Sequence, residues 1–271
     1  MRASRAGGLR ITRLRILKLG GSVVTHKDEY MSAHTQNIKR LAREIAEANS
    51  YPLVIVHGGG SFGHPVAKKH RIAEGMVDNS QIFGFSETHQ AMVKLNEIIV
   101  DILLEAGVPA FAISPSSMLY TNGKRLNELN TAIVKDYIEL GMVPVLYGDA
   151  VLDSEQTFAI LSGDQLIAKL SNDLGADNII FGSDVDGIFT DNPKMNPEAK
   201  LLEKVSIGNI EANVGDTTHT DVTGGMLGKL SEAAEAVKGG ANVIMVNAFE
   251  AGRVKAALRG EKVIGTILTL Y

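Results

Sequence analysis

Cysteine is absent from this chain of 271 residues. Its absence excludes disulfides, thiolate nucleophiles and zinc–thiolate sites. Long apolar runs are missing too, since none approaches the roughly 18 residues that a membrane-spanning helix needs. We therefore expect a protein without a membrane partner, in a reducing, cytoplasmic setting.

Basic residues are outnumbered by acidic residues outside the N-terminus. The net charge is −4, but residues 1–15 contain five arginines and no acid, which leaves 22 basic and 31 acidic residues and a net charge of −9 in the rest. A body of this charge does not attract nucleic acid through its general field, so we expect no nucleic-acid partner. Residues 1–13 lack the apolar segment of a secretory signal. We interpret them as a solvated N-terminal extension whose order the sequence leaves open.

The remaining chain alternates predicted helices with short apolar strands. Hydrophobic residues make up 45% and charged residues 21%, which is ordinary for a globular protein. This alternation predicts an α/β fold, with a mostly parallel central sheet covered by helices on both faces. We expect strands at 14–19, 53–57, 108–114, 143–147, 178–181, 243–246 and 266–270, helices at 37–48, 88–106 and 131–140, and a β-hairpin that pairs 151–152 with 158–161.

The chain is organised around the strand 53–57 and the loop Gly58-Gly59-Gly60-Ser61-Phe62-Gly63-His64 that follows it. Glycines adopt backbone angles closed to other residues, so their N–H groups can converge on an anion. A helix that starts near Pro65 would add its positive N-terminal end. Imidazole donates hydrogen bonds to phosphate and titrates near neutrality. The loop therefore predicts a phosphate site with His64 at its rim.

The same loop fits two other patterns. Gly58-x-Gly60-x-x-Gly63 matches the dinucleotide fingerprint, and Asp78 lies at the distance of its acidic residue. Gly59-x-Ser61-x-Gly63 matches the nucleophile elbow of α/β-hydrolases, with Asp184 and His219 later in the chain as triad partners. The loop alone does not choose among the three interpretations.

Two further glycine loops lie next to lysines. Lys18 precedes Gly20-Gly21-Ser22, and Gly224-Gly225 precedes Lys229 by one helical turn. A lysine in a strand either lies on a sheet edge, pairs with a carboxylate or reaches into an anion site, and the adjacent glycines favour the last. Glycines followed by a lysine one turn into a helix suit a phosphate clamp.

Three other charged residues have two interpretations each. Lys27, in a polar stretch, would by itself be a surface residue. Asp164 is either part of a helix N-terminus with Ser162 or an acid that orients lysines. Asp184 follows a strand, where it could serve a ribose, Mg²⁺ or a turn. Together with the glycine loops, these residues describe a site for several phosphates, and phosphoryl transfer needs such positioning and positive charge.

Five motifs in order give the chain a family resemblance. They are Lys18-Leu-Gly-Gly-Ser22, His57-Gly-Gly-Gly60, Ser162-Gly-Asp164, Ser183-Asp184-Val-Asp186-Gly187 and Asp221-Val-Thr-Gly-Gly225-x3-Lys229. Over about residues 14–270 the chain resembles the amino acid kinase superfamily. Within it, the His64 loop, Lys27 and Tyr147-Gly-Asp149 are similar to the isopentenyl phosphate kinases. The resemblance implies the amino acid kinase fold, a three-layer αβα sandwich, and a homodimer. It also implies ATP- and Mg²⁺-dependent phosphorylation of isopentenyl phosphate to isopentenyl diphosphate in the archaeal-type mevalonate route.

The resemblance also implies roles for individual residues. Lys27 would stabilise the transition state, and Asp164 would orient the lysines. Acceptor phosphate would be bound by Gly59, Gly60, Gly163 and His64. ATP would be bound by Lys18, Gly20, Gly21, Ser22, Gly60, Asp184, Gly224, Gly225 and Lys229. The catalytic residues would be Lys18, Lys27, His64 and Asp164, with no protein ligand assigned to a metal.

The isoprenyl tail requires an apolar pocket, and we expect its walls at Phe83, Phe85 and Ile160, each of which could instead be core packing. We assign acceptor binding to about residues 14–175 and nucleotide binding to about 176–271. Two alternatives stay open: another small-molecule kinase of the superfamily, such as a fosfomycin or uridylate kinase, and a non-catalytic nucleotide-binding protein.

Overall fold

The computed structural model describes residues 13–191, 193, 195–208 and 224–271. Of the predicted N-terminal extension, only residue 13 falls within them. No helix in these ranges is long and apolar enough to cross a membrane.

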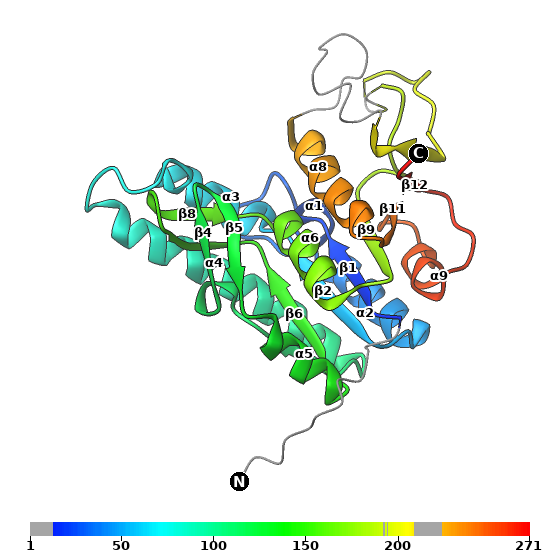
Figure 1. Ribbon diagram of the computed structural model, residues 1–271, viewed down its shortest axis with the longest axis horizontal. Coiled ribbons are helices and arrows are strands. Elements are labelled where there is room, and N and C mark those ends of the chain that lie inside the picture. The colour runs from blue at the N-terminus through cyan, green and yellow to red at the C-terminus, as the bar shows by residue number, and fades with distance from the viewer. Residues whose placement is uncertain (1–12, 192, 194, 209–223) are drawn as a thin grey trace.

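The described residues form an eight-stranded sheet and a four-stranded sheet (Figure 1). The large sheet has the order β10-β12-β11-β9-β1-β2-β6-β3, and its strands are parallel except where β12 runs against β11. Its strands are β1 (Arg15–Leu19), β2 (Leu53–His57), β3 (Ala110–Ala112), β6 (Val143–Tyr147), β9 (Asn178–Ser183), β10 (Lys204–Ser206), β11 (Asn242–Asn247) and β12 (Thr266–Thr269). The predicted parallel α/β sheet is thereby confirmed, and β1 lies at its centre.

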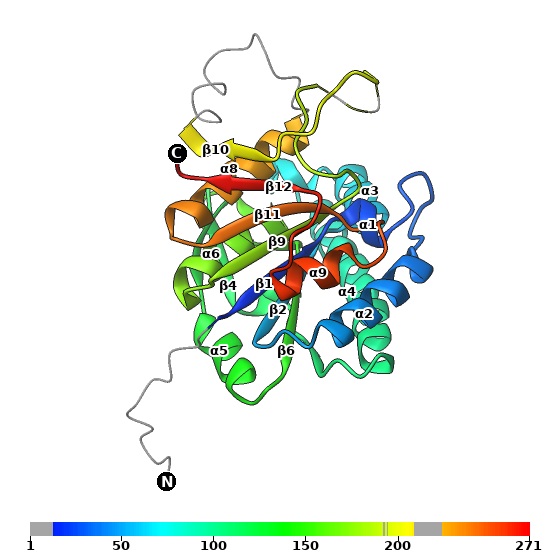
Figure 2. The same cartoon turned by 90° about the vertical axis from the view of Figure 1, so that its right-hand side faces the viewer.

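Helices cover both faces of this sheet (Figure 2). One hydrophobic core lies between the sheet and α2 (Thr35–Ala48), α4 (Gln81–Glu105) and α9 (Arg253–Arg259). The second lies between the other face and α5 (Thr131–Glu139), α6 (Gly163–Leu174) and α8 (Gly224–Lys238). Each core draws residues from both ends of the chain, because the strands after residue 176 extend the same sheet beyond β1.

The small sheet has the order β5-β4-β7-β8. Strands β7 (Asp149–Asp153) and β8 (Thr157–Leu161) pair antiparallel, which confirms the predicted hairpin. The sequence analysis did not anticipate β4 (Leu119–Asn122) and β5 (Arg125–Leu129). They are joined by Gly123 and Lys124, both with positive φ, as in the type I′ turns that suit two-residue hairpins.

Short helices follow the first two strands of the large sheet. These are α1 (Gly21–Val24) and α3 (Gly60–Lys69), with single 3₁₀ turns η1 (Ile72–Glu74) and η2 (Pro115–Ser117) elsewhere. The helix α4 begins seven residues before the predicted position 88. The buried side chain of Gln81 explains the early start, because its amide donates to carbonyls of His70, Arg71 and Gly75 and so closes the preceding loop.

The loops after β1 and β2 pack backbone against backbone. A Cβ added to Gly21 would lie 2.6 Å from the backbone nitrogen of Gly60, and one added to Gly58 would lie 2.7 Å from that of Gly21. Gly60 also has a φ of +46°, which disfavours other residues. The glycines therefore do more than expose N–H groups, since they let the two loops meet.

We expect Gly21→Ala to lower the free energy of unfolding by about 1–3 kcal/mol, because the added methyl group meets fixed backbone. Gly228→Ala is the control, since a Cβ on this glycine of α8 meets nothing within 4 Å. It should be neutral or stabilise by up to about 1 kcal/mol, because alanine favours a helix. Urea unfolding of both variants measures the difference, and equal stability would contradict the close approach.

His57 ends β2 beneath these loops and is fully buried. Its Nδ1 lies 3.1 Å from the Gly58 carbonyl and its Nε2 lies 3.1 Å from Asn96 Oδ1 of α4. Its ring stacks on Tyr147, with centroids 5.4 Å apart. Burial lowers the pKa of His57 to about 4, so the imidazole is neutral at neutral pH.

Because the folded-state pKa of His57 lies below the unfolded value, this residue's contribution to stability is complete above about pH 6.5 and is lost as the pH falls toward 4. The loss amounts to about 2 kcal/mol at pH 5. The free energy of unfolding should fall between pH 7.5 and pH 5 in both proteins. We expect the fall in His57→Gln to be smaller than in the native chain by that amount. Urea unfolding at both values measures this, and identical pH dependence in the two proteins would refute it.

Candidate active site

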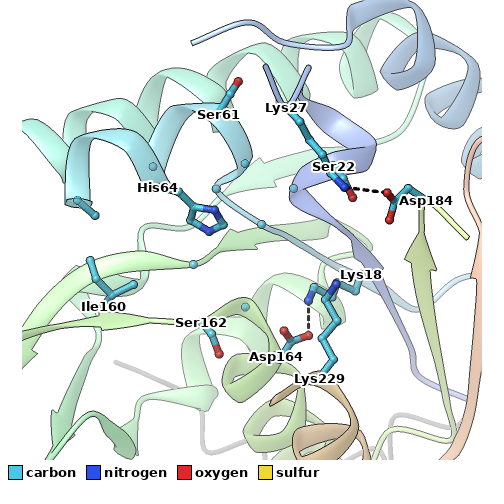
Figure 3. A pocket seen from close by; sticks show the side chains of 18 of the residues that line it. Lys18, Ser22, Lys27, Ser61, His64, Ile160, Ser162, Asp164, Asp184 and Lys229 are labelled. Carbon is cyan, nitrogen blue, oxygen red and sulfur yellow. Dashed lines mark hydrogen bonds and ion pairs between the residues drawn. The ribbon is translucent and has the colours of Figure 1, made fainter. Parts of the chain in front are cut away.

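A cavity of about 650 Å³ lies beyond the carboxyl ends of β1, β2 and β9 (Figure 3). This is the expected place for a ligand in an open α/β sheet, because the strand order reverses around β1. The residues that line the cavity and were predicted for the site are Lys18, Gly21, Ser22, Lys27, Gly59, Gly60, His64, Ile160, Gly163, Asp164, Asp184 and Lys229. Segments far apart in the sequence therefore share one site.

Lys18 is a buried lysine near the end of β1, and its ammonium group pairs with Asp164 in the first turn of α6. Burial lowers the pKa of Lys18, and nearby Lys229 lowers it further, while Asp164 opposes both. Ser162 is the N-cap of α6, where its hydroxyl accepts from the Gln165 N–H. In this motif, Ser162 caps the helix and Asp164 pairs with Lys18.

Lys27 lies in the loop between α1 and α2, and its Nζ is 2.9 Å from Asp184 Oδ2. Its side chain is 58% exposed and that of Asp184 is 20% exposed. Figure 3 shows the pair across the upper part of the cavity, above Lys18. The sequence placed Asp184 with the nucleotide, and the structure adds this contact with the predicted transition-state lysine.

His64 points into the cavity from the first turns of α3 (Figure 3). Loss of hydration lowers the pKa of His64, and the positive charges of Lys229 and Lys18 lower it further. Helices α3 and α6 begin at Gly60 and Gly163 beside it. Because the first N–H groups of a helix have no partner within it, both helix ends can donate to an anion.

Gly20 is a predicted loop residue that does not line the cavity. Its N–H donates to the carbonyl of Gly182 at 3.0 Å, so it is not available to a phosphate. Gly224 and Gly225 begin α8. Residues 221–223 of that motif, and His219 of the hydrolase alternative, lie outside the described residues.

Of the three residues predicted for the tail pocket, one lines the cavity and two do not. Ile160 lines the cavity. Phe83 is 73% exposed on α4, and Phe85 stacks on Phe158 in a small core, so neither lines it. The apolar wall instead includes Met92 and Ala67, from α4 and α3. These two have ordinary helical spacing and gave no sequence signal.

Neither alternative for the glycine loop gains support. The Ser61 hydroxyl donates to the carbonyl of Ser32, and Asp184 pairs with Lys27, so neither is placed as in a catalytic triad. Asp78 accepts from Ser80 in an exposed turn rather than following a second strand. Within the described ranges, no cluster of three His, Asp or Glu residues has the geometry to hold a metal ion.

Comparison with known proteins shows the family of the chain. The model of the amino acid kinase family matches residues 13–247. An isopentenyl phosphate kinase of Methanothermobacter thermautotrophicus is 42% identical over 94% of this chain and 98% of its own length. Among solved structures, an isopentenyl phosphate kinase is 39% identical with a TM-score of 0.84, over 94% of this chain and all 100% of that one. An isopentenyl phosphate kinase in a substrate complex is 29% identical with a TM-score of 0.78, over 94% and 99%. The chain therefore belongs to the amino acid kinase family and, within it, to the isopentenyl phosphate kinases.

Proposed function

We propose that this chain transfers the γ-phosphoryl group of ATP directly to isopentenyl phosphate, giving isopentenyl diphosphate. The observation that carries the proposal is that His64 faces the same cavity as Lys18, Lys27 and Lys229. A kinase whose acceptor is a carboxylate has no need of an imidazole aimed at a monophosphate. A kinase whose acceptor is itself a phosphate does need such a group. The relatives with high identity and coverage support the same acceptor.

Transfer needs no general base, because an oxygen of the acceptor phosphate is already an anionic nucleophile. The protein's part is to align the two phosphates and to stabilise charge on the transferring group. Lys18, held by Asp164, bridges toward that group from the centre of the sheet. Lys27 approaches from the opposite side and stabilises the transition state. Lys229 and the first N–H groups of α8 serve the nucleotide.

His64 and the N-terminal ends of α3 and α6 hold the acceptor phosphate. Loss of hydration and then the charges of Lys229 and Lys18 lower the pKa of His64. An anionic phosphate beside the ring would offset their charge and favour the imidazolium, which donates a stronger hydrogen bond. Acceptor binding and proton uptake by His64 are therefore coupled.

Mg²⁺ fits this site as an ion that arrives on the nucleotide. The two central carboxylates, Asp164 and Asp184, are each paired with a lysine. Mg²⁺ is commonly bound by substrate phosphates and waters with only one or two carboxylates, which suits this donor set. When bound, it would neutralise charge on the ATP phosphates, and Asp184 would be the carboxylate to hold it.

Three further expectations belong to this proposal. Residues from about 14 to 175 would bind the acceptor and those from about 176 to 271 the nucleotide. The homodimer that the family resemblance implies stays a prediction, which sedimentation velocity tests. The cytoplasmic setting likewise stays a prediction from composition.

The first test is ATP-dependent turnover of isopentenyl phosphate, with uridylate, fosfomycin and glutamate in parallel. We expect a strong preference for isopentenyl phosphate. Lys27→Ala should lower kcat, and His64→Ala should lower kcat/KM for the acceptor, each by about 100-fold, because each removes a donor to developing or bound negative charge. Lys68→Ala and His70→Ala, at the far end of α3, are matched controls and should change little.

Turnover of another acceptor in place of isopentenyl phosphate would reject the substrate and retain the kinase. Absence of turnover on all four compounds, with ATP still bound, would support the non-catalytic alternative.

A second test concerns the isoprenyl tail. We expect Ile160→Ala to raise KM for isopentenyl phosphate by about tenfold with KM for ATP unchanged, because it removes apolar contact from the pocket wall. Phe83→Ala is the control, since its side chain is exposed and outside the cavity. Steady-state kinetics of both variants decide, and a larger effect for Phe83→Ala would place the tail on α4's surface instead.

A further inference from the structure

Ser61 is a buried serine in the glycine loop, and the proposed chemistry makes no use of its hydroxyl. Ser61 Oγ donates to the Ser32 carbonyl at 3.3 Å and lies 3.4 Å from the Ser32 N–H, which donates to it. In Figure 3 the side chain points away from Lys18 and Asp164. The hydroxyl therefore contacts the loop that contains Lys27 rather than the reacting groups.

The backbone of Ser61 contacts the same loop at two more places. Its N–H donates to Thr25 Oγ1 at 3.0 Å, and its carbonyl accepts from the Met31 N–H at 3.1 Å. Thr25 is buried and donates in turn to the Gly21 carbonyl at 2.8 Å. We call the hydrogen bonds of Ser61 with Thr25, Met31 and Ser32 the Ser61 clasp.

The clasp holds both ends of an exposed loop. Residues 27–30 are exposed, while Thr25 before them and Ser61 beneath them are buried. The loop is closed further by the His26 N–H, which donates to the Ser32 carbonyl at 3.0 Å, and by a bridge between Thr25 and Ala33. Lys27 thus projects from a loop that is held by Ser61 of the glycine loop 58–64.

We propose that Ser61 and Thr25 are positioning residues that fix Lys27 relative to the acceptor phosphate. The inference rests on the proposed function, in which Lys27 acts on the transferring group. Lys27 has a long side chain that is 58% exposed, and its ion pair with Asp184 restrains only the ammonium end. The clasp restrains the backbone end. Ser61 and His64 lie on the same helix. This one helix therefore positions both Lys27, through the clasp, and the acceptor phosphate, through His64.

The kinetic test is a double-mutant cycle between Ser61 and Lys27 in the full chain. We expect Ser61→Ala to lower kcat by about tenfold with KM for ATP within about twofold, because misplacement of a catalytic group costs rate more than binding. In the Lys27→Ala background the same substitution should change kcat by less than about twofold, since its target is gone. Thr25→Val should behave like Ser61→Ala, and Thr25→Ser, which keeps the hydroxyl, should retain activity.

Ser171→Ala is the matched control, because Ser171 is as buried as Ser61, at 4%, but lies on α6. It should leave kcat unchanged in both backgrounds. An equal loss from Ser61→Ala with and without Lys27 would overturn the proposal. Complete loss in Ser61→Ala together with an active Lys27→Ala would overturn it in favour of a serine nucleophile.

Hydrogen–deuterium exchange of the peptide that covers residues 26–33 gives a readout without turnover. We expect faster exchange in Ser61→Ala than in the native chain or Ser171→Ala, because the Ser32 N–H loses its acceptor. Unchanged exchange would overturn the clasp whatever the kinetics. If the native chain does not phosphorylate isopentenyl phosphate, the proposed function fails, and this exchange comparison still decides whether Ser61 holds the Lys27 loop.

Discussion

The site depends on the close approach of two glycine loops at the centre of the sheet. Gly21 and Gly60 meet backbone to backbone, at a distance that leaves no space for a Cβ on either side. Parallel pairing of β1 with β2 brings the two loops to the same edge. Since Lys18 precedes one loop and His64 follows the other, this contact sets the separation between the groups assigned to the transferring and acceptor phosphates.

Electrostatics explains how the site holds several lysines. Lys18 is buried and would be costly as an isolated charge, so its pairing with Asp164 is required for the charged form. Lys27 is paired with Asp184, so two of the lysines that line the cavity each have a carboxylate partner. The carboxylates therefore stabilise the charged forms of these lysines.

Ser61 illustrates how a motif can predict the wrong chemistry while marking an important position. The pattern around it matches a nucleophile elbow, yet its hydroxyl is engaged with the backbone of Ser32. A strand followed by a tight glycine turn and a helix is a geometry that hydrolases and phosphate-binding loops share. What differs is the set of neighbouring groups, and these come from Thr25 and Ser32 on another segment.

The sequence by itself determined the parallel sheet, the hairpin of β7 and β8, the glycine loops and the family, because periodicity and motifs are local properties. Only the tertiary structure decided the contacts between segments. Lys27 and Asp184 are 157 positions apart and meet because β9 neighbours β1. Ile160 and Phe83 look alike as apolar residues, but β8 directs one into the cavity and the start of α4 leaves the other in solvent. Side-chain neighbours depend on strand order and helix packing, which no short stretch of sequence specifies.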